Sequence, residues 1–485
     1  MDYDAVVSKL FERHRSVQSA GFSGDAYKPG LEAMADYSAS LGDPQRRFRC
    51  IHVAGTNGKG SVCSMLAAAL AACGLRVGLY TSPHLLDFRE RIKIIRPAPA
   101  EGRYSRFAQH LISKEAVCEF LERYDREGLT FFEVTTGMAF WWFAQQNVDV
   151  AVIETGLGGR LDSTNIITPE LSVITSIGLD HCDLLGSTRE LIAGEKAGIF
   201  KSGVPALVWG RDPETQPVFE RVAEATGSPL YFAEDFPLPP EARTGEYDLD
   251  GPCQEQNLRT VLAALDILYD FSLRTERVSE NQPVAENGPG KRAQTVLRKH
   301  LSDNDLWNTV LEAVAHAGAI TGLRGRWEIL SRDPLVICDI GHNPPALAAN
   351  FARLRTMMTQ VVQTADHQER KPAQNATGGP LEGPPASPGP LLVVYGAMRD
   401  KDVAAISSLV PEDAEYFLVQ PDTPRALPLP DLALKLKHLH HSCSGTVAQG
   451  VRDALDRARQ IPGAIIYIGG STYVVSEAIS YLESL

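Results

Sequence analysis

Short apolar runs alternate with helical stretches along most of the chain. Patterns typical of buried strands recur at 50–54, 76–80, 148–153, 171–175, 335–338, 391–395 and 464–468. Between them lie stretches of helical character, such as the alanine-rich run 61–73 and an apolar run that passes through Trp141 and Trp142. Continuous apolar strands separated by helices indicate an α/β fold with a mostly parallel sheet.

Polar stretches interrupt this pattern. Residues 3–41 have an amphipathic helical pattern that breaks at 21–30, and a further helix is expected over 260–268. Residues about 279–290 and 358–390 are polar and rich in Pro, Gly or Gln, so we interpret both as insertions. We expect the second insertion to be dispensable, with activity within a few-fold after its deletion.

A glycine-rich turn follows the first predicted strand. The sequence Gly55-Thr56-Asn57-Gly58-Lys59-Gly60-Ser61 lies between an apolar run and a helix, which is the layout of a phosphate-binding loop. Glycines let backbone N–H groups face an anion, the helix N-terminus adds positive potential, and Lys59 supplies a cation. The match with the usual loop is incomplete, because Val53 occupies the first glycine position and Gly60 separates Lys59 from Ser61. A glycine-rich turn with a surface lysine is the alternative.

Polar side chains also follow several other predicted strands. Ser82 comes after the second strand, Glu154 after the strand at 148–153, and Asp180-His181 after a later one. The carboxyl ends of parallel strands meet at one edge of a sheet, where ligands bind, and a carboxylate there suits magnesium. Two alternatives stay open: Ser82 could cap the next turn, and the arginines of 89–91 could form a solvated face.

One lysine lies inside an apolar turn. It is Lys196 in the sequence Glu195-Lys196-Ala197-Gly198-Ile199-Phe200-Lys201, which follows a predicted helix. The residues leave three roles open, namely a salt-bridged core lysine, a phosphate contact, or a metal ligand whose amine has been carboxylated.

A second domain is expected after residue 318, giving domains over 1–318 and 319–485. Its first buried strand runs into Asp339-Ile340-Gly341-His342-Asn343-Pro344, which is a Rossmann-like opening. Its last strand runs into Gly469-Gly470-Ser471-Thr472, which is either an anion-binding turn or an ordinary connection to the final helix.

Composition narrows the functional classes. A formal net charge of −13 argues against nonspecific nucleic-acid binding. The eight cysteines are scattered without a C-x-x-C pair, which favours free thiols in a reducing compartment. No apolar run approaches the length of a membrane span, and the N-terminus lacks the plan of a signal peptide. We therefore expect a cytoplasmic protein that binds neither nucleic acid nor membranes.

Taken together, these stretches resemble the folylpolyglutamate synthase/dihydrofolate synthase family of the Mur ligase superfamily. The resemblance rests on residues 55–61, 81–85, 89–91, 154–165, 180–181, 195–200 and 339–344. The Gly60 that departs from the usual loop matches the pattern of this family. The resemblance implies an α/β protein with a P-loop ATPase domain, built on a mostly parallel sheet, and a smaller C-terminal Rossmann-like domain. A monomer is the family-like expectation.

The resemblance also implies an activity. ATP phosphorylates a carboxylate, and the amino group of L-glutamate attacks the resulting acyl phosphate to give an amide. The carboxylate belongs to dihydropteroate (dihydrofolate synthase) or is the γ-carboxylate of a reduced folate (folylpolyglutamate synthase). Two magnesium ions are implied, and a monovalent cation is a further option.

Roles for individual residues follow from the same matching. The catalytic set is Lys59, Lys196, His181 and His342. ATP would contact Thr56, Asn57, Gly58, Lys59, Gly60, Ser61, Asn257, Arg326 and Asp339, the last two from the C-terminal domain. One magnesium ion would be held by Ser82 and Glu154, and the second by His181 and a carboxylated Lys196. Substrates would contact Lys28, Gly30, Leu31, Arg91, Thr130, Phe131, Phe132, Glu133, Leu161, Asp162, Ser163 and Ser471. Phe132 could stack on the pterin ring while Asp162 bonds its polar edge.

Other functions stay open. The chain could have only one of the two synthase activities. A ligase that adds an amino acid to a cell-wall nucleotide precursor would need a UDP-binding domain before the phosphate loop, and the roughly fifty residues there are short for one. A P-loop switch that hydrolyses ATP slowly would leave Lys196, His181 and the Asp339/His342 cluster without a role.

Overall fold

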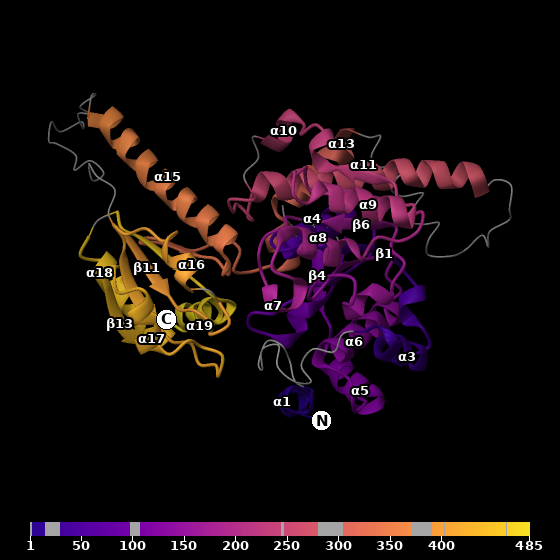
Figure 1. The fold of residues 1–485 in the computed structure, drawn as a ribbon, viewed down its shortest axis with the longest axis horizontal. Coiled ribbons are helices and arrows are strands. Elements are labelled where there is room, and N and C mark those ends of the chain that lie inside the picture. Colours follow the sequence, from indigo (N-terminus) through magenta and orange to yellow (C-terminus); the bar gives the residue numbers. More distant parts are fainter. Residues whose placement is uncertain are drawn as a thin grey trace. The chain divides into compact units, whose positions relative to one another are not determined.

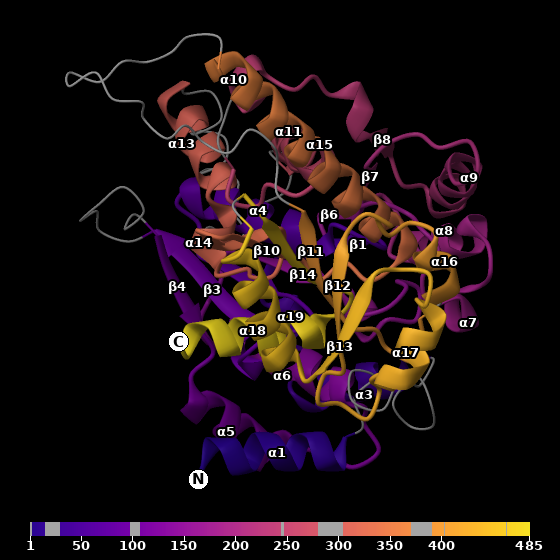
Figure 2. The ribbon, with the colours of Figure 1, turned by 90° about the vertical axis from the view of Figure 1, so that its left-hand side faces the viewer.

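The computed structural model describes residues 2–14, 30–97, 107–243, 247–279, 304–369, 390–401, 403–461 and 463–485. The chain divides into two compact units (Figures 1 and 2). The first unit comprises Met1–Leu249 and Cys253–Arg324, and the second comprises Asp250–Pro252 and Gly325–Leu485. The sequence predicts the boundary after residue 318, whereas the compact units part after Arg324.

An eight-stranded sheet forms the centre of the first unit, in the order β4-β3-β2-β5-β1-β6-β7-β8. Neighbouring strands run parallel except at the pairs β2–β3 and β3–β4, which are antiparallel. The mostly parallel sheet that the sequence predicts is therefore confirmed. The strands are β1 (Arg49–Ala54), β2 (Val77–Tyr80), β3 (Ile92–Pro97), β4 (Phe107–Leu111), β5 (Val150–Glu154), β6 (Leu171–Ile174), β7 (Ala206–Val208) and β8 (Leu230–Phe232).

Helices cover both faces of this sheet. Alternate residues of β5 point to opposite faces, so Val150 and Val152 pack in one cluster with α4, while Ala151 and Ile153 pack in another with α6. In both views α1 lies beside α5 (Figures 1 and 2). The helices are α1 (Tyr3–Arg13), α3 (Glu32–Ser40), α4 (Lys59–Ala72), α5 (Lys114–Tyr124), α6 (Phe131–Gln145), α7 (Cys182–Leu185), α8 (Arg189–Ala197), α9 (Gln216–Thr226), α10 (Pro240–Arg243), α11 (Gln254–Ser279), α13 (Asn304–Ala315) and α14 (Ala317–Thr321).

The second unit has a six-stranded sheet in the order β13-β12-β11-β14-β10-β9. Only the pair β9–β10 is antiparallel among the strands described, which confirms a second α/β unit. The strands are β9 (Glu328–Arg332), β10 (Leu335–Cys338), β11 (Leu391–Tyr395), β12 (Glu415–Val419), β13 (His441–Gly445) and β14 (Ile465–Gly469). The helices are α15 (Pro344–Glu369), α16 (Val403–Ser407), α17 (Leu429–Lys435), α18 (Val447–Ala458) and α19 (Thr472–Glu483).

Two helices are longer than the sequence pattern predicts. Helix α11 continues to Ser279 instead of ending at 268, and α15 continues to Glu369, so the expected insertion at 358–390 begins too early. Residues 269–279 and 358–369 are polar but contain neither Pro nor Gly, so nothing in them breaks a helix. Residues 280–290 and 370–389 of the two predicted insertions lie outside the described residues.

A buried histidine in β1 makes the first unit sensitive to acid. His52 is fully buried, its Nε2 lies 2.8 Å from the Thr164 hydroxyl, and burial and then the nearby Lys201 lower its pKa to about 3. Below the ordinary pKa of about 6.5, the unfolded chain takes up a proton that the folded chain does not, so acid favours unfolding. We expect His52 to reduce the free energy of unfolding by about 1.4 kcal/mol per pH unit between about pH 6.5 and 3.

Urea unfolding at pH 7.5 and 5.5 measures this loss. In His52→Gln the difference between the two pH values should shrink by about 1.4 kcal/mol relative to the unchanged chain. An equal difference in both proteins would show that His52 does not titrate on unfolding.

Candidate functional site

The central strand β1 brings the polar strand ends of the first unit to one edge of the sheet. In the parallel registers Val53 pairs with Glu154 of β5, and Ala54 pairs with Ile174 of β6. Strand β2 pairs with β5 on its other side, with Tyr80 opposite Ile153. The loops that follow these four strands therefore start side by side.

A small cavity of about 30 Å³ lies among these loops. It is lined by the phosphate loop, the turn after β5, the segment after β6 and the end of α8. The lining residues are Gly55, Thr56, Lys59, Thr155, Gly156, Leu157, Gly158, Asp180, His181, Leu185 and Lys196. The structure thus brings Lys59 together with His181 and Lys196, both of which follow it by more than a hundred residues in the sequence.

The phosphate loop has the geometry of an anion site. Gly58 is the N-cap residue of α4, with a φ of +88°, and no side chain caps the helix. The N–H groups of the first turn of a helix have no acceptor within the helix, so this end of α4 offers donors and positive potential. A Cβ on Gly58 would lie 2.5 Å from Oδ1 of Asn257, which places the Asn257 side chain against the loop. Gly60 and Ser61 are buried in the first turn.

Two lysines supply positive charge in this cavity. Lys59 donates from Nζ to the carbonyl oxygens of Gly55 at 3.1 Å and Thr56 at 3.2 Å. Lys196 is buried and donates from Nζ to the carbonyl oxygen of Gly55 at 2.7 Å. Burial, and then the nearby cation Lys59, lower the pKa of Lys196 to about 7. A large share of Lys196 is therefore neutral near pH 7, which a lysine in water is not.

His181 has an uncommon backbone conformation. Its φ of +52° and ψ of +38° are left-handed, and it precedes α7 as the N-cap residue. Non-glycine residues in this region are uncommon and cluster at functional sites, where the surrounding structure maintains the strain. Its Nε2 lies 3.8 Å from Oδ2 of Asp180, which also lines the cavity.

Ser82 and Glu154 lie together at the ends of adjacent strands. The backbone N–H of Ser82 donates to Oε2 of Glu154 at 3.0 Å, and Glu154 is buried. Neither residue is in the lining of the small cavity. In the described ranges no three His, Cys, Asp or Glu side chains gather closely enough to hold a metal ion by themselves.

Several residues that line the cavity were not among the predicted site residues, and Thr155 is the one that bears on a ligand. Its Oγ1 is buried and has no hydrogen-bond partner among the described residues. A buried hydroxyl without a partner is uncommon, and it points to a ligand at this position. The signal was present in the sequence, because Thr155 directly follows Glu154 at the end of a predicted strand.

Several predicted substrate contacts have structural partners. Thr130 and Glu133 form a capping box at the start of α6, in which each side chain accepts from the other residue's N–H, at 3.2 and 2.7 Å. Phe131 is buried, stacks on Phe11 with ring centroids 4.7 Å apart, and lies under the guanidinium of Arg91 at 5.2 Å.

Asp162 is the clearest of these cases. Its buried carboxylate accepts from the N–H groups of Leu157 at 2.8 Å and Thr164 at 3.0 Å, and from the Thr164 hydroxyl. Burial raises its pKa, and these hydrogen bonds oppose the rise. Asp162 therefore holds the turn that lines the cavity, and its contact with a substrate stays a prediction.

The structure describes most of the other predicted substrate residues. Phe132 is half-buried and contacts Gly156, where a Cβ would lie 2.5 Å from the ring. Leu161 and Ser163 flank Asp162 and are half-buried. Gly30 has a φ of +133° and Leu31 is the N-cap residue of α3, while Lys28 lies outside the described residues.

Four predicted site residues belong to the second unit. Asp339 follows β10 and accepts from the N–H groups of Trp327 at 2.8 Å and Gly341 at 2.7 Å. Ser471 is buried and caps α19 by accepting from Val474 N–H at 3.2 Å. Arg326 lies just before β9, and His342 lies just before α15. Both residues are half-buried. Their part in a site stays a prediction.

Comparison with known proteins identifies relatives along nearly the whole chain. No family model matches it. None of the helices in the described ranges is both long and apolar enough to cross a membrane. The folylpolyglutamate synthase of Lacticaseibacillus casei is 32% identical over 443 residues, which cover 90% of each chain.

Two solved structures extend the likeness to the fold. Escherichia coli FolC in complex with DHPP and ADP matches with a TM-score of 0.67 and 27% identity, covering 100% of this chain and 98% of that one. A bifunctional folylpolyglutamate synthase/dihydrofolate synthase with Mn, AMPPNP and L-glutamate bound matches with a TM-score of 0.69 and 26% identity, at the same coverage. The chain belongs to the folylpolyglutamate synthase/dihydrofolate synthase family.

Proposed function

We propose that this protein is an ATP-dependent ligase that joins L-glutamate to the carboxylate of dihydropteroate and to the γ-carboxylate of reduced folates. The observation that carries the proposal is the cavity shared by the phosphate loop, His181 and Lys196. The relatives supply the substrates, since one structure holds DHPP with ADP and another holds AMPPNP with L-glutamate.

ATP fits the phosphate loop of this chain. The uncapped start of α4 and the Lys59 ammonium favour an anion, and two lysines in one cavity repel each other until an anion neutralises them. We assign the phosphates to residues 56–61. Asn257 contacts the loop from α11 and would reach the same nucleotide.

Magnesium fits two sets of oxygen and nitrogen donors. Mg²⁺ is usually held by one or two carboxylates together with water and substrate phosphates, so a site without three acidic side chains suits it. We assign one ion to Ser82 and Glu154, and a second to His181 and a carboxylated Lys196. The Thr155 hydroxyl is a further oxygen donor in the cavity. A bound divalent ion would neutralise charge between the phosphates and the carboxylate substrate.

Carboxylation of Lys196 requires a neutral amine. The Nζ lone pair attacks CO₂, a new N–C bond forms, and one proton is released, leaving an anionic carbamate. Because the pKa of Lys196 is about 7, the reactive neutral form is well populated at neutral pH. The carbamate would place a negatively charged oxygen in the cavity that His181 lines. Among the described residues, Asp180 supplies the one carboxylate of this lining.

The reaction then depends on charge neutralisation and positioning. A carboxylate oxygen of the folate attacks the γ-phosphorus, ADP leaves, and an acyl phosphate results. The glutamate amine attacks the acyl carbon, and the tetrahedral intermediate expels phosphate to leave the amide. Lys59 and the N–H groups at the start of α4 stabilise the oxygens of the transferred phosphoryl group.

The remaining residues have supporting or candidate roles. Thr130 and Glu133 fix the start of α6, and Asp162 fixes the turn after β5. This leaves the ring of Phe132, which is half-buried beside Gly156, as our candidate to stack on the pterin. In the second unit, our candidates to contact ATP or glutamate are Arg326, Asp339, His342 and Ser471.

Phosphate release tests the proposal. Purified protein with ATP, magnesium and glutamate should release phosphate when either dihydropteroate or tetrahydrofolate is added, and should release little without a folate acid. Release with only one of them would restrict the chain to one activity.

Two results would contradict the proposal. Release that is equal with and without folate acid and glutamate would indicate a P-loop switch. If the folded protein released no phosphate with either acid, the result would favour a ligase for cell-wall precursors instead. Lys59→Ala is the control, because it should remove release under every condition.

A further inference from the structure

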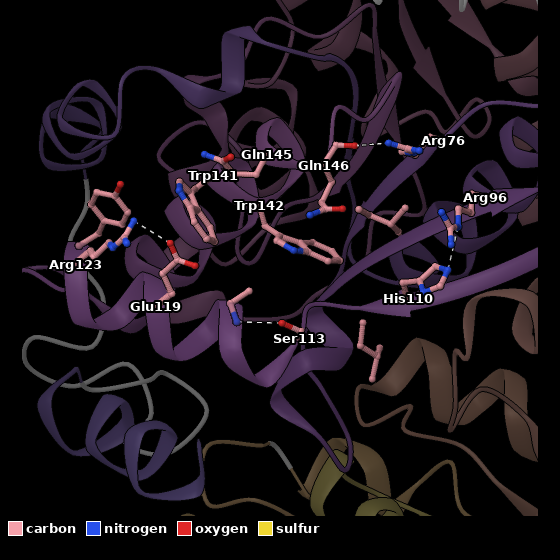
Figure 3. A pocket seen from close by; sticks show the side chains of 14 residues that line it. Arg76, Arg96, His110, Ser113, Glu119, Arg123, Trp141, Trp142, Gln145 and Gln146 are labelled. Carbon is pink, nitrogen blue, oxygen red and sulfur yellow. Dashed lines mark hydrogen bonds and ion pairs between the residues drawn. The ribbon is translucent and has the colours of Figure 1, made fainter. Parts of the chain in front are cut away.

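A second, larger pocket lies elsewhere in the first unit. It has a volume of about 630 Å³, which is within the usual range for small-molecule sites. It is formed by the start of β2, strands β3 and β4, helix α5 and the end of α6, and it shares no lining residue with the small cavity. Its lining includes Arg76, Arg96, Arg123, Glu119, Trp141 and Trp142 (Figure 3).

Two of its arginines lie one position beyond the last residue pair of strands β2 and β3, Arg76 just before β2 and Arg96 within β3. Strands β2 and β3 are antiparallel with Val77 opposite Ile95, so Arg76 and Arg96 occupy the next positions. Both side chains line the pocket and therefore lie on the same face of the sheet. Like charges at such neighbouring positions repel each other, and an anion between them removes this cost. Their placement is a reason to expect a ligand.

Neighbouring groups hold these arginines and leave nitrogens for a ligand. Arg76 donates from Nη1 to the carbonyl oxygen of Gln146 at 2.7 Å, and Arg96 donates from Nε to Nε2 of His110 at 3.0 Å. A guanidinium has three nitrogens that donate in a fixed fork, so each retains further donors suited to a carboxylate or phosphate. Burial, and then Arg96, lower the pKa of His110, which favours its neutral form.

The third arginine marks the other end of the pocket. Figure 3 shows Arg123, with its partner Glu119, far from Arg76 and Arg96, and the indole of Trp142 between them. Three arginines and one glutamate line the pocket, so positive charge is concentrated there in a chain whose net charge is −13. Trp142 is only 6% exposed, so its indole is part of the pocket wall and offers no free ring face. Cations at both ends of the pocket suit an elongated anion.

We propose that this pocket is a second ligand site, which binds a small, elongated organic anion. One acidic group lies between Arg76 and Arg96, and the rest of the ligand extends past Trp142 towards Arg123. Carboxylates and phosphates share the chemistry that an arginine fork recognises, so the test has one arm for each.

Isothermal titration calorimetry on the full chain tests the site with two probes. The carboxylate probe is 2,6-naphthalenedicarboxylate, and the phosphate probe is 1-naphthyl phosphate. We expect one-to-one binding of at least one probe, and the stronger of the two identifies the acidic group. Arg96→Gln should weaken this binding about tenfold or more, and Arg123→Gln should weaken the dicarboxylate in the same direction.

Matched controls separate this site from the small cavity. Arg126→Gln removes a nearby exposed arginine that does not line the pocket, and it should leave binding unchanged. Lys59→Ala should also leave binding unchanged. The proposal is overturned if neither probe binds, if Arg96→Gln binds as well as the unchanged chain, or if Lys59→Ala abolishes binding. Circular dichroism of each variant confirms that it is folded.

Discussion

Lys196→Ala is expected to reduce ligation about a hundredfold to a thousandfold, since removing one charge-stabilising group from an active site has an effect of this order. The variant loses the buried nitrogen that donates to Gly55 and, under our proposal, the carbamate that binds the second metal ion. Added short carboxylic acids should partly restore phosphate release, because their carboxylate can occupy the place of the carbamate. The measurement is folate-dependent phosphate release at saturating substrates.

Lys201→Ala is the matched control. Lys201 lies in the turn after α8 and donates from Nζ to the carbonyl oxygen of Asn165 at 2.9 Å, away from the cavity lining. Its replacement should change ligation by no more than a few-fold. Undiminished ligation by Lys196→Ala would rule out the metal-binding role.

Gly55→Ala is expected to lower the free energy of unfolding by about 3 kcal/mol or more and to abolish nucleotide binding. The φ of Gly55 is +153°, and a Cβ there would lie 1.7 Å from Oγ1 of Thr175 and 2.9 Å from its Cβ. The loop would have to move away from β6, and with it the carbonyl that accepts from both Lys59 and Lys196. Urea unfolding and ATP titration measure the two effects.

Gly74→Ala is the control that distinguishes the steric clash expected at Gly55 from the strain of a positive φ alone. Gly74 also has a positive φ, +86°, but no atom lies within 4 Å of its added Cβ. Its replacement should cost only about 1–2 kcal/mol and leave ATP binding unchanged. Equal losses in the two variants would show that contact with Thr175 is not the cause.

The fold was predictable because continuous apolar runs leave little choice. The strands at 335–338 and 391–395 have the predicted bounds, since each is a short apolar run between polar segments. The polar strand ends were predictable for the same reason, because a parallel sheet places them at one edge.

The partners of the side chains were not predictable from the sequence. Thr130 and Glu133 have the spacing of a capping box, yet the resemblance favoured a substrate role for both. Asp162 is likewise engaged by Leu157 and Thr164, a contact that depends on how the turn closes. Burial of such polar groups is decided by tertiary structure, and a sequence pattern alone does not show it.

The central position of β1 also affects how the protein is made. The phosphate loop at 55–61 leaves the ribosome early, but its partners Thr155, His181 and Lys196 are synthesised much later. Long-range contacts of this kind form late and expose apolar strands until they do. A nascent chain that stops before Lys196 therefore has the phosphate loop without the rest of the cavity.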